Sequence, residues 1–263
     1  MLVTYIVVFI LGSLWGSFSN VCIYRLPERG NVVFSRSACR SCQSKISWFD
    51  NIPFVSFIIL KGKCRNCNFK IPFQYFLVEL IVSFGFLLSF YFFGFTIATL
   101  LFFILTIFFT IIFFIDLKHF IIPNELTFPL MAIGFFKSFD PNLNKYLFPD
   151  YINSLIGGVA GYLIIWFIIF VYKKIKNKEG MGLGDAKLLS ALGFWFGWIC
   201  IPFILFFSSF VALVIAIPSL LKKSKTMTSQ IPFGPYLVLA CVMYLFLFKQ
   251  IIIFLNQWKK FYT

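Results

Sequence analysis

The chain has 263 residues, of which 60% are hydrophobic and only 12% are charged. Soluble domains typically carry about 25% charged residues, so this composition excludes an ordinary soluble domain and indicates an integral membrane protein. The net charge of +14 would suggest a nucleic-acid partner in a soluble protein. In a membrane protein, Lys and Arg instead gather in cytoplasmic loops and fix the orientation. We therefore expect a lipid bilayer and no nucleic acid as a partner.

The apolar run from Leu2 to Tyr24 predicts a first transmembrane helix, covering residues 1–24. The composition then changes over residues 25–72, where nine basic and two acidic residues give a net charge of +7 (9 − 2). The positive-inside bias places this insert in the cytoplasm. The basic residues are Arg25, Arg29, Arg36, Arg40, Lys45, Lys61, Lys63, Arg65 and Lys70, and the acidic ones are Glu28 and Asp50.

Two cysteine pairs within this insert predict a metal site. Cys39 and Cys42 form one C-x-x-C pair, and Cys64 and Cys67 form the other, with 21 residues between the pairs. This spacing is close to that of four-cysteine zinc sites, in which four thiolates form a closed tetrahedral structural centre. A small insert also needs such a staple to fold. We predict structural zinc, with a redox pair as the alternative.

Residues 73–263 predict a polytopic membrane domain. A transmembrane helix needs roughly 20 apolar residues, and seven further apolar runs follow the insert. The fold class is therefore all-α, with about eight transmembrane helices and a small cytoplasmic zinc-binding insert. The predicted runs are Phe73–Phe93, Ile97–Ile115, Ile121–Phe139, Tyr151–Tyr172, Ala186–Ile199, Ile201–Leu221 and Gly234–Leu255.

Two acids at the margins of these runs are the candidate catalytic residues. Asp116 follows the run from Ile97 to Ile115, and Asp185 precedes a short apolar run, directly behind Gly182 and Gly184. The charges of the connecting loops place both acids at cytoplasmic helix ends. Buried or membrane-embedded acids are costly and usually functional, although either acid alone could be an interfacial or turn residue.

A pair of neighbouring carboxylates is suited to acid–base catalysis. Two close carboxylates share one proton and titrate as a unit, so one can activate water while the other hydrogen-bonds a peptide carbonyl. We therefore predict an aspartic peptidase. An ion- or proton-coupled transporter could use the same two acids, and an assembly protein that docks through its insert is a third possibility.

Five stretches, in order along the chain, resemble the bacterial type IV prepilin peptidase family, whose members are bifunctional leader peptidases and N-methyltransferases. The resemblance covers nearly the whole chain. The stretches are residues 16–27, the two cysteine pairs around residues 46–53, residues 116–124, Gly182-Leu183-Gly184-Asp185, and residues 231–235.

The resemblance implies roles for individual residues. Asp116 and Asp185 are the catalytic aspartates, supported by Pro123, Gly182, Gly184 and Lys187, and the four cysteines Cys39, Cys42, Cys64 and Cys67 are the metal ligands. Glu79 lies where the family often has an acid, which we associate with the methylation cofactor. Arg40, by contrast, stands where the family commonly has proline.

The resemblance also implies the activity and its setting. The expected substrates are type IV prepilin or pseudopilin precursors with short basic leaders, cleaved at the cytoplasmic face of the inner membrane. Cleavage would be followed by N-methylation of the new N-terminus with S-adenosylmethionine as donor. Type IV pili, type II secretion and DNA uptake are the systems that such an enzyme could serve.

Overall fold

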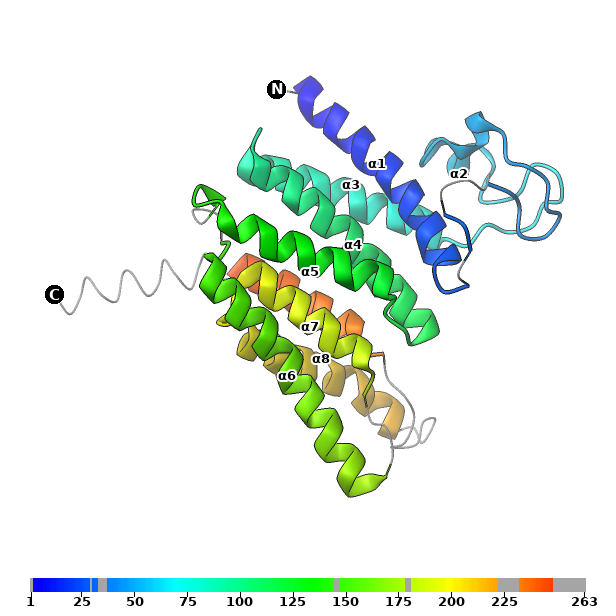
Figure 1. The fold of residues 1–263 in the computed structure, drawn as a ribbon. Helices are drawn as coiled ribbons and strands as arrows, with labels where there is room; N and C mark the ends of the chain where they lie inside the picture. The colour runs from blue at the N-terminus through cyan, green and yellow to red at the C-terminus, as the bar shows by residue number, and fades with distance from the viewer. Residues whose placement is uncertain are drawn as a thin grey trace. The chain divides into compact units, whose positions relative to one another are not determined.

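The computed structural model describes residues 2–28, 30–32, 37–143, 147–177, 181–221 and 232–247. Within these ranges the chain is helical, and none of the described residues lies in a strand (Figure 1). The α-helices are α1 (Leu2–Arg25), α2 (Val55–Ile59), α3 (Gln74–Phe93), α4 (Ile97–His119), α5 (Asn124–Phe136), α6 (Tyr151–Lys176), α7 (Leu183–Phe196), α8 (Cys200–Leu221) and a further helix, Gly234–Leu247. Two short 3-10 turns, Trp48–Asn51 and Lys137–Phe139, complete the described helical elements.

A helix occupies each predicted apolar run, which confirms the all-α fold class. Five of them, α1, α3, α4, α6 and α8, are long and apolar enough to cross a membrane. The other three are shorter, because α5 has 13 residues, α7 has 14, and the described part of the last helix ends at Leu247. Eight full spans are therefore not confirmed, and residues 248–255 of the last predicted run lie outside the described residues.

The chain divides into two compact units, Met1–Ile115 and Asp116–Thr263. The boundary falls inside α4, four residues before that helix ends. The predicted division into residues 1–24, 25–72 and 73–263 separates the membrane segments from the insert, whereas the two units are defined by their compactness. That division remains a prediction. Both candidate catalytic acids belong to the second unit, and all four paired cysteines belong to the first.

In the first unit, α1 and α3 pack antiparallel through small residues on α1. A Cβ added at Gly16 would lie 2.6 Å from the Cα of Glu79, and one added at Gly12 would lie 2.6 Å from the Cα of Ser83. The two contacts step one turn along each helix in opposite directions. Glycines at such spacing let membrane helices approach closely, so these positions have no room for a side chain.

In the second unit, α7 is the central helix, in contact with α5, α6 and α8 (Figure 1). Ten of its 14 residues are buried, which explains a short helix that is apolar on all sides. Gly193 on α7 packs directly against the backbone of Gly157 on α6. The Ser190 hydroxyl donates a 2.7 Å hydrogen bond to the carbonyl of Gly158. This packing fixes the start of α7, where Asp185 lies.

Candidate active site and metal centre

Asp116 lies three residues before the end of α4, and its side chain is only 4% exposed. Its Oδ2 accepts a 2.9 Å hydrogen bond from the backbone N–H of Gly234, the first residue of the last helix. A Cβ at Gly234 would lie 2.8 Å from that same Oδ2. Position 234 must therefore be glycine for the amide to reach the carboxylate.

Asp185 lies in the first turn of α7 and is 8% exposed. The helix begins at Leu183, two residues earlier than the predicted run. Asp185 Oδ2 accepts the backbone N–H of Gly182, the N-cap residue, at 3.3 Å. Since glycine has no side chain, only this half of a capping box can form. An acid in the first turn is also stabilised by the helix dipole.

The structure brings the two acids together within the second unit. Asp116 accepts the N–H of Gly234, and both Gly234 and Gly184, the residue before Asp185, pack against Ile122. The Ile122 side chain packs against both glycines. A Cβ at Gly184 would lie 3.1 Å from the Cβ of Ile122, and a Cβ at Gly234 would lie 3.0 Å from the Cδ1 of Ile122. Gly184 is thus required by close packing, whereas a Cβ at Gly182 would lie 3.6 Å from Asp185 Oδ2, an ordinary contact distance.

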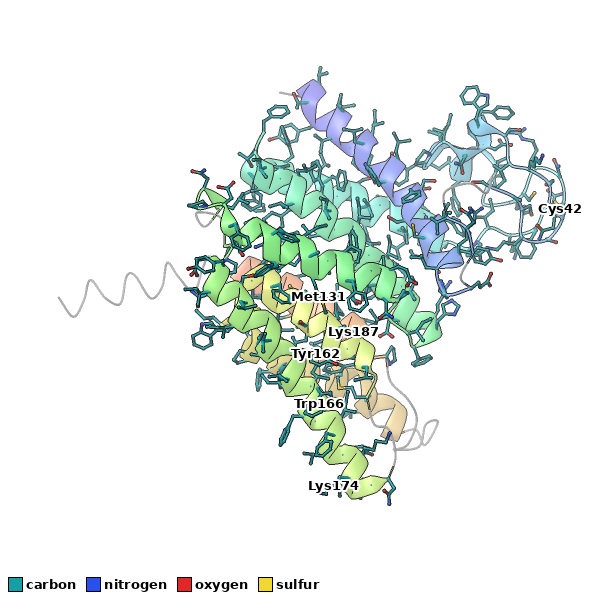
Figure 2. The ribbon with its side chains drawn as sticks, viewed as in Figure 1. Cys42, Met131, Tyr162, Trp166, Lys174 and Lys187 are labelled. Carbon is teal, nitrogen blue, oxygen red and sulfur yellow. The ribbon has the colours of Figure 1, made fainter. Side chains whose placement is uncertain are left out.

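The two supporting residues Pro123 and Lys187 meet at the start of α5. Pro123 is the extended N-cap residue of α5. The Lys187 ammonium donates a 2.7 Å hydrogen bond to Oδ1 of Asn124, and it lies 5.3 Å from the ring centroid of Phe128 (Figure 2). Lys187 therefore holds α7 against α5, and its ammonium is directed to an amide oxygen.

This arrangement can perform acid–base chemistry on a peptide. In aspartic peptidases, two close carboxylates share one proton, because both cannot ionise cheaply at once. The ionised member can accept a proton from water, and the protonated member can donate a hydrogen bond to a carbonyl oxygen.

The four predicted ligands form a metal-binding cluster in the insert (Figure 2, Cys42). Their Sγ atoms all lie within 4.8 Å of one another, and those of Cys39 and Cys67 are 3.7 Å apart. A tetrahedral zinc ion with Zn–S bonds of about 2.3 Å needs Sγ separations of about 3.8 Å. The thiols therefore fit such an ion.

Each cysteine pair is held by the same backbone geometry. A β-bridge joins Ala38 to Lys45 around the first pair and Lys63 to Lys70 around the second. The N–H of Cys39 bonds the carbonyl of Ser44, and the N–H of Cys64 bonds that of Phe69. The insert thus presents its thiols from two equivalent knuckles.

Hydrogen bonds prepare two of these thiols for metal binding. The Ser44 hydroxyl lies 2.9 Å from the Cys42 sulfur, and its hydrogen bonds lower the pKa of the Cys42 thiol to about 6. Backbone N–H groups of Cys67 and Asn66 lower the pKa of the Cys64 thiol. Because the thiolate is the metal-binding form, both shifts favour a bound cation.

Glu79 lies on α3 in the first unit and is 7% exposed. Its Oε2 accepts a 2.9 Å hydrogen bond from the backbone N–H of Phe54, and the Ser17 hydroxyl also bonds the carboxylate. The structure thus shows Glu79 linking the insert to α1 and α3.

Sequence reasoning missed two contacts. The first is the amide of Gly234, which a motif position alone could not assign to Asp116. The second is Arg40, whose guanidinium lies 4.0 Å from the Tyr24 ring centroid and donates a 2.6 Å hydrogen bond to the Tyr75 hydroxyl. The arginine at position 40, where the family commonly has proline, was the one feature of the sequence that could have indicated this contact. Cys22, Cys200 and Cys241 are buried and lie outside the metal-binding cluster.

Comparison with known proteins gives a consistent result along the chain. Residues 10–93 match the family model of the bacterial peptidase A24 N-terminal domain, and residues 103–217 match that of the type IV leader peptidase family. No solved structure matches the chain.

Several curated proteins named prepilin leader peptidase/N-methyltransferase are similar to the chain over most of their length. The Aeromonas salmonicida protein is 36% identical over 268 residues, covering 89% of this chain and 87% of the relative. The Pseudomonas aeruginosa protein is 36% identical over 257 residues, covering 88% and 86%. The Vibrio cholerae protein is 34% identical over 260 residues, covering 92% and 96%. Together with the paired acids and the four-cysteine insert, these matches show that the chain belongs to the type IV leader peptidase family.

Proposed function

We propose that this chain is a membrane-embedded aspartic endopeptidase that removes the short basic leader from type IV prepilin or pseudopilin precursors. The observation that carries the proposal is the placement of Asp116 and Asp185, two buried carboxylates from separate helices whose neighbouring glycines, Gly234 and Gly184, both pack against Ile122. The family to which the chain belongs and the names of its relatives agree with this chemistry.

In this proposal the two aspartates act as one unit. The ionised carboxylate takes a proton from water, and the resulting hydroxide attacks the scissile carbonyl carbon. The protonated carboxylate hydrogen-bonds the carbonyl oxygen and then supplies a proton to the leaving amine. The Gly234 N–H fixes Asp116 Oδ2, so the carboxylate is oriented before substrate binds.

We place the protein in the inner membrane as a multi-pass protein, with the acids facing the cytoplasm. Five candidate spans support the membrane location, and the basic insert supports the orientation through the positive-inside bias. The apolar helix that follows a prepilin leader can lie in the same bilayer, which would bring the leader junction to the membrane surface.

Structural zinc in the insert and S-adenosylmethionine are the proposed cofactors. The separations of the four sulfur atoms support zinc, since they suit a tetrahedral ion of that size. S-adenosylmethionine rests on the names of the relatives, which include N-methyltransferase activity. The assignment of Glu79 to methylation stays a prediction.

The transporter alternative has no support among the relatives named above, which are each a prepilin leader peptidase/N-methyltransferase by name. A cleavage assay on the full-length protein in detergent, with a synthetic prepilin-like precursor, tests the proposal. We expect a product that has lost its leader at the glycine before the apolar helix. An intact precursor, with the enzyme folded and metal-loaded, would refute it.

A further inference from the structure

The insert contains one apolar stretch, residues 52–60, that the metal site does not use. Its sequence is Ile-Pro-Phe-Val-Ser-Phe-Ile-Ile-Leu, and Ser56 is its one polar side chain. The side chains of Ile58 and Ile59 are 65% and 67% exposed, and Val55 is also exposed. An exposed apolar patch of this kind marks a surface that contacts a partner or a membrane.

The membrane boundary near this stretch is marked by two tyrosines. Tyr24, at the end of α1, and Tyr75, at the start of α3, both contact the Arg40 guanidinium. Tyrosine and arginine side chains are typical of the membrane–water interface. These three side chains therefore indicate the level of the membrane–water interface at the end of α1 and the start of α3.

The apolar stretch packs at this level and reaches past it. Phe57 contacts Phe73 and Phe76 at the start of α3, and Phe54 meets Phe76 edge-on. Glu79 follows Tyr75 by one helical turn, about 6 Å along α3, and it accepts the backbone N–H of Phe54 at 2.9 Å. The Phe54 ring stacks on Phe9, with centroids 5.6 Å apart, and Phe9 in turn meets Phe84 edge-on.

The depth of these ring contacts follows from helix geometry. Phe9 precedes Tyr24 by 15 residues, about 22 Å along α1 at 1.5 Å per residue. Half of a bilayer hydrocarbon core is about 15 Å thick. Phe54 therefore packs against a part of α1 that lies in the hydrocarbon core.

Several backbone groups of the stretch are paired within the protein. In lipid, N–H and C=O groups must be satisfied within the protein, and non-helical backbone is tolerated there only when it is covered. The N–H of Phe54 bonds Glu79, that of Val55 bonds the Pro53 carbonyl, and that of Ser56 bonds the Ile52 carbonyl. The Ser56 hydroxyl is also internally bonded, to the carbonyls of Phe49 and Ile52.

The chain leaves the stretch through a tight basic turn. Lys61 and Gly62 both have left-handed backbone angles, with φ of 50° and 65°, and the N–H of Gly62 returns to the Phe57 carbonyl. The exposed residues Lys61 and Lys63 are thus close to α2, where anionic headgroups would attract them.

We infer that residues 52–60 form a re-entrant segment whose exposed face, Val55, Ile58 and Ile59, contacts lipid acyl chains. The segment enters the leaflet at which α1 ends, packs its Phe54 ring against α1, and returns to the headgroups at Lys61. Glu79 is the positioning residue that accepts the Phe54 N–H within the membrane.

Site-specific photo-crosslinking tests this inference on the full-length protein in vesicles of phosphatidylethanolamine and phosphatidylglycerol. A diazirine amino acid replaces Ile58, with Lys45 in the first cysteine knuckle as the aqueous control and Leu100 in α4 as the lipid-facing reference. We expect lipid adducts at positions 58 and 100 by mass spectrometry, several-fold above position 45. Solvent adducts at 58 like those at 45, or crosslinks at 58 to a second copy of the chain, would overturn the inference.

Two substitutions at Glu79 test the anchor in the same assay. Glu79→Gln retains an acceptor oxygen for the Phe54 N–H, so the lipid adducts at position 58 persist. Glu79→Leu removes the acceptor, and we expect those adducts to fall several-fold while position 100 still labels lipid and the protein still binds metal. Unchanged lipid adducts at position 58 in Glu79→Leu would refute the anchoring role.

Discussion

The two proposed catalytic acids are each held by a backbone contact, and an added Cβ at Gly234 would disturb the contact of Asp116. Asp116 and Asp185 are each held by a backbone N–H, from Gly234 and Gly182 respectively. Both donors belong to glycines at the start of helices, where the backbone approaches the carboxylate directly. The site therefore requires both the two carboxylates and the glycine N–H groups that hold them.

Replacing either acid by its amide should stop cleavage. Asp116→Asn and Asp185→Asn each remove a group that must exchange protons, and we expect losses of at least about 10²-fold in the rate of leader removal. The matched control is Asp140→Asn, in the loop after α5, which should cleave normally. The measurement is precursor conversion on gels, and normal processing by either active-site variant would contradict the paired mechanism.

Gly234→Ala should separate orientation from folding. The new Cβ would lie 2.8 Å from Asp116 Oδ2, a side-chain atom that can move aside, so the helix should still form. We expect kcat to fall by up to about 10²-fold, because small misplacements of a catalytic group have effects of that size. Cleavage kinetics and a thermal melt check this, and unchanged kcat with an unchanged melting temperature would show that the amide contact is dispensable.

At the element scale, the position of α7 follows from backbone-to-backbone packing. Gly157, Gly158 and Gly161 on α6 face α7, where a Cβ at Gly161 would lie 2.7 Å from the Leu189 carbonyl oxygen. A backbone atom cannot yield as a flexible side-chain end can. The packing of α6 against α7 therefore fixes the position of Asp185, although the packed glycines are not part of the acid pair.

Gly161→Leu should destabilise this pair. Overpacking of a close interface costs roughly 1–3 kcal/mol, so we expect a lower melting temperature in detergent and a parallel loss of cleavage. Val159→Leu, at an exposed position on the same helix, is the matched control and should melt like the parent. A Gly161→Leu protein with parental stability would mean that α6 can shift without affecting α7.

The insert should depend on its metal in the same way. Cys39→Ser or Cys64→Ser removes one of four ligands, and metal binding and folding of such sites are coupled. We expect loss of bound zinc by elemental analysis and faster proteolysis between residues 37 and 70. Cys22→Ala, at a buried cysteine of α1, should keep its metal. A parent protein without zinc, with its cysteine pairs as disulfides, would favour the redox alternative.

At the scale of the whole molecule, the chain divides into two compact units that hold different candidate residues. The second unit holds both acids, and the first holds the four thiols and Glu79. Cleavage and methylation should therefore be separable by substitution. The order of the two reactions is set by the substrate, because the nitrogen is an unreactive amide before cleavage and an amine with a pKa of about 7.7–8.0 afterwards.

Glu79→Ala should reduce methylation and spare cleavage. The expected result is a processed pilin-like product that lacks the added methyl mass when S-adenosylmethionine is supplied. Mass spectrometry of the product measures both reactions at once. Glu79→Gln distinguishes the reasons, since it retains an acceptor for Phe54 but not the charge, and normal methylation by Glu79→Ala would exclude the residue from that activity.

The residue types and their spacing are enough to indicate the chemistry available to this protein. Long apolar runs specify helices wherever they occur, because the bilayer requires the backbone to pair within each segment. The spacing of Cys39, Cys42, Cys64 and Cys67 specifies a tetrahedral thiol set in the same local way. Asp116 and Asp185 stood out because acids are costly beside such runs.

The contacts between these residues are visible only in the folded chain. The contact of Gly234 with Asp116 spans 118 residues of chain, and no local pattern reports which distant amide will face a carboxylate. Lys187 follows Asp185 by two residues, yet its ammonium bonds Asn124 at the start of another helix. The sequence shows Glu79 only as an acid that follows the insert. Its hydrogen bond with the Phe54 N–H results from the packing of residues 52–60 against α1 and α3. Such contacts arise from close packing between segments far apart in sequence, and local spacing carries no record of them.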